Sequence, residues 1–141
     1  MSETCKDLVR AAYNSRIGDI RKLWNLYRED CEARTNDGEN WNEYGLAWDY
    51  LPPGTFTDQK RGYFRYQLSY GGPSEEFRFY VDERLQITRC EFWYLDWFDG
   101  AKINVTGKGL DLLREIWDDL VDCECPQAWL KKANEYPLFG R

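Results

Sequence analysis

The chain has 141 residues, of which 43% are hydrophobic and 17% aromatic, and its formal net charge is −6. This length suits one ordinary domain over residues 1–141, large enough to fold without disulfide or metal support. The acidic balance disfavours direct nucleic-acid binding, which needs basic side chains to replace the counterions around phosphates. Histidine is absent, which excludes histidine-based catalytic triads and histidine-ligated zinc.

The N-terminal part of the chain is predicted to be helical. Apolar side chains recur at three- and four-residue steps over residues 8–13 and again over residues 17–31. Asn14 and Ser15 lie between the two stretches, so we expect an interruption there with Ser15 as the cap of a second stretch. The turn-forming residues 35–38 then end the helical pattern.

The middle of the chain predicts a sheet. Large apolar and polar side chains alternate in four segments, which predicts strands at residues 63–70, 76–82, 86–98 and 102–106. Short turns join them, with Asp99-Gly100 as the last hairpin signal, so we expect an antiparallel four-stranded meander. Residues 38–60 lack clean periodicity and are expected to form an ordered loop that holds at most a short helix or strand.

Two helical segments follow the predicted sheet. One has an apolar face that runs from Leu110 to Val121, and Pro126 can begin a short last helix. Helices on either side of one contiguous sheet segment predict an α+β fold. We expect the N-terminal and C-terminal helices to flank the meander and to cover one of its faces.

The helix after the sheet concentrates negative charge. Between Leu110 and Cys125 there are six acidic residues and a single basic one, Arg114. Like charges one turn apart repel each other, and the helix dipole disfavours acids near the C-terminal end. The acids either form a solvated helix face or present a negative ridge to a basic partner. The partner-binding candidates here are Glu115, Asp118, Asp119 and Asp122.

A second candidate surface is the aromatic segment of residues 93–100. Strand alternation places Trp93 and Trp97 on one face and Tyr94 with Asp96 on the other, so both faces carry large rings. The segment is either core and hairpin, or an aromatic surface that binds cationic side chains. Its partner-binding candidates are Trp93, Tyr94, Asp96, Trp97 and Asp99.

Metal and catalytic signals are weak. Cys123 and Cys125, one residue apart, cannot close a zinc site alone, so we predict no metal and no cofactor. Glu91, Asp96 and Asp99 lie near one another in sequence, and carboxylate pairs can hydrolyse glycosides or hold Mg²⁺. A small carboxylate-dependent enzyme is therefore an alternative, which requires a pocket and a raised carboxyl pKa.

The cysteines and the apolar runs bear on location. The five cysteines are dispersed and odd in number, and no apolar secretory signal precedes the first helical pattern. Reduced thiols and a cytoplasmic location are expected from this usage. The apolar stretches in the strand region are too short for a membrane span, so we expect no membrane contact.

Part of the sheet region resembles known sequences. The stretches Phe77–Asp82 and Tyr94–Ala101 are similar to a pattern in small, uncharacterised proteins of bacterial plasmids and phages, over roughly Gly62–Gly107. The resemblance brings no assigned activity and no catalytic residue. It implies an accessory role in a mobile genetic element, where small acidic proteins often inhibit host defence or neutralise a toxin.

These observations lead to one functional hypothesis. We expect a non-enzymatic, acidic protein-binding module whose partner offers a basic surface, such as a nuclease or a toxin. Such a protein would act as an inhibitor of the anti-CRISPR or antirestriction type, or as an immunity protein. The alternatives are the carboxylate enzyme and an oligomeric structural protein with an exposed apolar sheet face.

Overall fold

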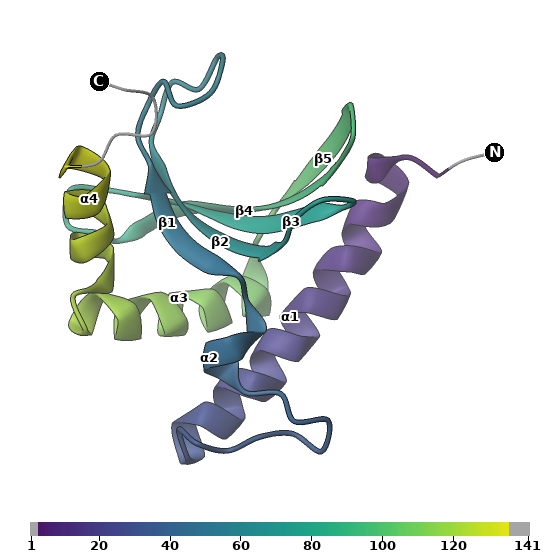
Figure 1. The fold of residues 1–141 in the computed structure, drawn as a ribbon, viewed down its shortest axis with the longest axis vertical. Helices are drawn as coiled ribbons and strands as arrows, with labels where there is room; N and C mark the ends of the chain where they lie inside the picture. Colours follow the sequence, from purple (N-terminus) through teal and green to yellow (C-terminus); the bar gives the residue numbers. More distant parts are fainter. Residues whose placement is uncertain (1–2, 136–141) are drawn as a thin grey trace.

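The computed structural model describes residues 3–135, which form one antiparallel sheet with helices packed on one face (Figure 1). The elements are α1 (Cys5–Glu29), α2 (Trp41–Tyr44), β1 (Ala47–Leu51), β2 (Tyr63–Ser69), β3 (Ser74–Val81), β4 (Ile87–Asp96), β5 (Asp99–Asn104), α3 (Gly107–Asp122) and α4 (Cys125–Glu135). The strand order is β1-β2-β3-β4-β5, and each neighbouring pair is antiparallel. The predicted α+β class and meander are confirmed, whereas the predicted number of four strands is wrong.

The additional strand is β1, which lies in residues 38–60, the segment expected to be an ordered loop with room for a short helix or strand; it holds both α2 and β1. Its five residues pair with β2, from Ala47 opposite Gln67 to Leu51 opposite Tyr63. Trp48 lies on the helix-covered side, where its ring stacks on Tyr66 at 4.2 Å. Because Pro52 cannot continue the ladder, the alternating run is too short to stand out in the sequence.

The N-terminal helix is continuous, so the interruption expected at Asn14 and Ser15 is wrong. Both residues are exposed, and the buried side chains before and after them anchor one uninterrupted helix on the sheet. Tertiary packing therefore overrides the weak helix propensity of these two residues. Thr4 and Asp7 form a capping box: the Thr4 hydroxyl accepts from the Asp7 N–H at 3.3 Å, and Asp7 accepts from the Thr4 N–H at 3.0 Å.

The last hairpin turns two residues earlier than predicted. Asp96 pairs with Asp99, so Trp97 and Phe98 form the two-residue loop, and Gly100 belongs to β5. Trp97 has a φ of 51°, a left-handed conformation that glycine or asparagine would adopt more readily. The Asp99 carboxylate instead accepts a hydrogen bond from the backbone N–H of Cys5 at 2.8 Å, which ties the hairpin to the start of α1.

The hydrophobic core lies between the sheet and the helices α1 and α3 (Figure 1). Phe64, Phe77, Phe79 and Phe92 point from β2, β3 and β4 into this layer, and Trp117 of α3 packs against them. The Trp117 ring stacks on Phe79 with centroids 5.4 Å apart. The opposite side of the sheet, here called the open face, is not covered by α1 or α3.

Candidate functional site

The acids of α3 face α1 across a concave region of the surface. We call this region the acidic hollow; its volume is about 440 Å³. Its lining residues are Trp24, Tyr27 and Arg28 from α1 and Glu115, Asp118, Asp119 and Asp122 from α3. Aromatic rings thus line one wall and carboxylates the other, which is a suitable environment for a cationic group.

The burial pattern of α3 explains why the acids line the hollow. Leu112, Leu113, Ile116 and Trp117 are buried, so this face of the helix is fixed on the sheet. The helical period then directs the four acids at positions 115, 118, 119 and 122 away from the core.

The α1 wall of the hollow is rigid. Trp24 is buried and stacks on Tyr27 with centroids 5.5 Å apart, while Trp41 meets it edge-on at 5.4 Å. Glu115 joins this wall to α3: its Oε2 accepts from the Trp24 indole N–H at 2.7 Å, and its Oε1 accepts from Arg28 at 2.9 Å. The carboxylate is thereby fixed before any ligand arrives.

The remaining three acids of the hollow are free. Asp118, Asp119 and Asp122 are exposed, and within residues 3–135 their side chains make no ion pair and no hydrogen bond. Glu115, in contrast, has part of its charge neutralised by Arg28. The hollow therefore has one positioned carboxylate and three with unused acceptor capacity.

The aromatic candidates of residues 93–99 lie elsewhere and are not together. Trp97 is 90% exposed at the hairpin tip, Trp93 lies on the open face, and Tyr94 packs against the core. Asp96 ends β4, and Asp99 contacts α1. The hairpin tip and the C-terminal half of α3 lie at opposite ends of the molecule, so the predicted residues form two separate surfaces (Figure 1).

The carboxylates of the enzyme hypothesis do not converge. Glu91 projects onto the open face. Asp96 lies five positions further along β4, so strand alternation directs its side chain to the opposite face. Burial opposes ionisation of Glu91, but hydrogen bonds from Lys102 and Trp93 outweigh it and hold the Glu91 pKa below its ordinary value. The backbone N–H of Cys5 likewise lowers the pKa of Asp99. A general acid would need a raised pKa instead.

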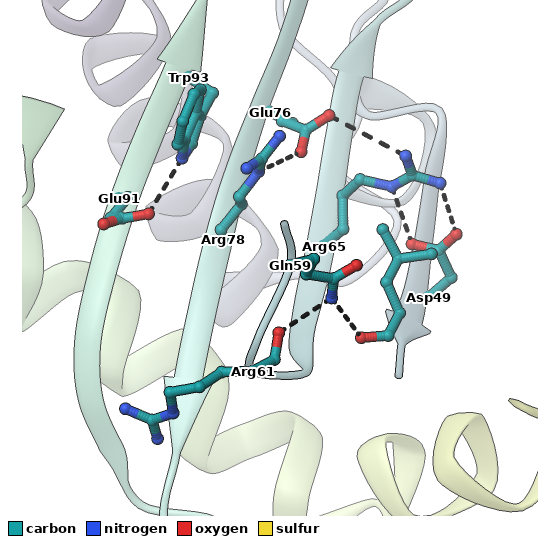
Figure 2. A network of polar contacts seen from close by, with 9 residues as sticks. Asp49, Gln59, Arg61, Arg65, Glu76, Arg78, Glu91 and Trp93 are labelled. Atoms are coloured by element: carbon teal, nitrogen blue, oxygen red, sulfur yellow. Dashed lines mark hydrogen bonds and ion pairs between the residues drawn. The ribbon is translucent and has the colours of Figure 1, made fainter. Parts of the chain in front are cut away.

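The open face carries a polar network that the sequence did not suggest (Figure 2). Arg65 donates to both carboxylate oxygens of Asp49, at 3.0 and 2.7 Å, and Arg78 donates to Glu76 at 2.7 Å. The Arg78 guanidinium also lies over the Trp93 ring, 3.9 Å from its centroid. Cationic side chains therefore cover the rings on this face, where helices cover them on the other.

The described residues offer neither a membrane-spanning helix nor a metal-binding cluster. No helix between residues 3 and 135 is long and apolar enough to cross a membrane. Over the same range, His, Cys, Asp and Glu side chains form no cluster of three or more that could hold a metal ion.

Comparison with known proteins gives no match: neither a family model, nor a curated protein, nor a solved structure matches the chain.

Proposed function

We propose that the protein is a non-enzymatic binding module that holds a basic segment of a partner protein in the acidic hollow. The observation that carries the proposal is the position of three unpaired carboxylates, those of Asp118, Asp119 and Asp122, beside the rings of Tyr27 and Trp24. A lysine or arginine side chain placed there meets carboxylates and an aromatic surface at once.

The cost of these acids to the helix supports a binding role. Asp118 and Asp122 are one turn apart and repel each other, as do Glu115 and Asp119, and all four lie toward the C-terminal end of α3. No basic residue occupies the last turn to offset them. Within residues 3–135 the three aspartates give the fold no hydrogen bond or ion pair, whereas Glu115 binds Trp24 and Arg28. A basic ligand would relieve the repulsion that the aspartates cause.

The electrostatics also suit capture of a partner. The chain carries a net charge of −6, and a concave surface lined by one sign of charge accelerates the approach of an oppositely charged partner. We favour a partner whose basic surface has its own function, such as the nucleic-acid site of a nuclease or a toxin. Occupation of that surface would make this protein an inhibitor or an immunity protein.

The test is a binding measurement with a fluorescent lysine-rich peptide of about ten residues, long enough to cross the hollow in extended form. Asp118, Asp119 and Asp122 are all replaced by Lys, and the control replaces the exposed acids Glu3, Glu39 and Glu83 by Lys. Both triple variants change the net charge equally. We expect the hollow variant to bind roughly tenfold or more weakly, with a flatter salt dependence. Equal losses in both variants would contradict the proposal.

A further inference from the structure

A groove on the open face differs in charge from the rest of the molecule. It has a volume of about 490 Å³ and lies between residues 56–61 and the strands β2, β3 and β4. The loop that forms its rim is held in place by Gln59, whose side-chain N–H groups donate to the Leu51 carbonyl at 3.2 Å and the Arg61 carbonyl at 2.9 Å (Figure 2). These two hydrogen bonds fix the rim of the groove against the end of β1.

Basic side chains dominate the lining of this groove. Its charged residues are Lys60, Arg61, Arg78, Arg89 and, as the single acid, Asp58. The nearby carboxylates of Glu76 and Glu91 are buried and do not line the groove; Glu76 is bound by Arg78, and Glu91 by Lys102 and Trp93. An acidic chain with a net charge of −6 thus has a groove with four cations on its walls.

Two guanidinium groups converge on one ring in the groove. Arg61 lies 5.6 Å and Arg89 lies 4.2 Å from the centroid of the Tyr80 ring. Arg89 and Lys102 both pair with the Glu91 carboxylate: the Arg89 Nε lies 3.3 Å and the Lys102 Nζ lies 2.8 Å from its Oε2. The Arg61 side chain makes no ion pair or hydrogen bond within the part of the chain that the structure describes, so its donors are free. Forked N–H donors of this kind match the oxygens of a phosphate group.

We propose that this groove binds a nucleoside phosphate. The phosphate would lie between Arg61 and Arg89, and the base would stack against the wall formed by Arg78 and Trp93, in which the Arg78 Cζ lies 3.9 Å from the centroid of the Trp93 ring. The volume falls in the range of small-ligand sites. A small ligand suits the groove better than a long nucleic acid, because the acidic remainder of the surface repels an extended polyanion.

The groove is independent of the acidic hollow. The hollow is built by α1 and α3, which cover the other side of the sheet, and the two sites share no lining residue. Loss of one binding activity by mutation is therefore expected to leave the other unchanged.

The experiment is calorimetric titration of the full chain with ADP and, separately, with inorganic pyrophosphate. We expect ADP to bind with a Kd below about 1 mM and pyrophosphate to bind more weakly. Arg61→Gln should weaken ADP binding roughly tenfold. Among the described residues this variant removes no hydrogen bond. Lys22→Gln, an exposed change on α1, serves as the control and should bind like the parent.

Four outcomes would overturn the proposal. The absence of ADP binding at about 1 mM, the weak end of ordinary small-ligand affinities, would remove the site. Equal ADP affinity of Arg61→Gln and the parent would place the ligand elsewhere. Pyrophosphate affinity equal to that of ADP, or displacement of ADP by an acidic peptide at lower concentration, would assign the groove to anions without a base.

Discussion

The two faces of the sheet differ in what covers their aromatic rings. On the helix-covered face the rings meet other rings, as Phe79 meets Trp117 at 5.4 Å. On the open face they meet cations, as Trp93 meets Arg78 at 3.9 Å and Tyr80 meets Arg89 at 4.2 Å. Strand alternation alone generates both arrangements, since Arg78 and Phe79 are neighbours in β3.

We expect the helix-covered face to contribute mainly to folding stability and the open face to offer charged groups to a ligand. Rings packed on rings exclude water and account for most of the folding free energy. Rings on the open face contact guanidinium groups as well as each other, as Tyr80 contacts both Arg89 and Tyr63, which brings charged groups to the surface of the sheet. At the margin of the helix-covered side, α1 and α3 leave the acidic hollow between them.

The largest effect is expected from Trp117→Ala, which removes the ring that joins α3 to the sheet. Trp117 is 1% exposed, packs on Phe79 and Phe64, and donates its indole N–H to the Leu85 carbonyl at 2.7 Å. We expect a loss of about 3–5 kcal/mol in the free energy of unfolding, measured by urea denaturation. Trp117→Phe keeps most of the ring contact and should lose less. A loss under about 1 kcal/mol in the alanine variant would contradict the account of the core.

A smaller effect is expected from Glu91→Gln on the open face. Glu91 is 1% exposed and binds Lys102 at 2.8 Å and Trp93 at 3.0 Å. Glutamine keeps the shape but removes the charge, so we expect a loss of roughly 1–3 kcal/mol at neutral pH. Glu83→Gln, an exposed change, is the control. A larger loss in the free energy of unfolding than that of Trp117→Ala would contradict the expectation that the helix-covered face contributes more to stability than the open face.

The same variant has a pH signature. The folded-state pKa of Glu91 lies below the ordinary value of 4.5, so its stabilising contribution is present above that pH. The contribution disappears as the pH falls through 4.5 and then through the lowered pKa. Glu91→Gln should therefore lose less stability than the parent between neutral and acidic pH. Parallel stability curves for the two proteins would show that Glu91 is not stabilised as the carboxylate.

The smallest effect is expected at the hairpin tip. Trp97 is 90% exposed and has a positive φ, which asparagine tolerates better. Trp97→Asn should leave the free energy of unfolding unchanged or raise it by up to about 1 kcal/mol. A clear destabilisation would show that the ring has a folding role that its exposure does not reveal. Light scattering of the same variant would show whether the ring mediates self-association.

The sequence predicted the parts of the fold in which a pattern persists for several residues. Strands β2, β3 and β4 alternate over seven or more residues and lie close to their expected bounds. Strand β1 has five residues before Pro52, too few to separate from a loop. The last hairpin turns two residues earlier than predicted, and Asp99 binds the start of α1 instead of forming the turn. This contact joins residues far apart in sequence, so no local pattern indicates it.

The candidate site was predictable in part for the same reason. The exposed acids of α3 follow from helical period, and Asp118, Asp119 and Asp122 are exposed as expected. Trp24 and Tyr27 belonged to an apolar stripe that indicated only core, so nothing in the sequence placed them opposite the acids. The cations of the open face alternate with core rings along each strand, but their convergence depends on strand register.

The most direct test of the acidic hollow uses the indole N–H of Trp24, which donates to Glu115 on the hollow's wall at 2.7 Å. The lysine-rich peptide is titrated into ¹⁵N-labelled protein while the tryptophan indole resonances are followed. The account predicts a saturable shift of the Trp24 resonance, while that of Trp117, bound to the Leu85 carbonyl beneath α3, stays in place. An unmoved Trp24 resonance at peptide saturation would contradict the proposal that the hollow is the binding site.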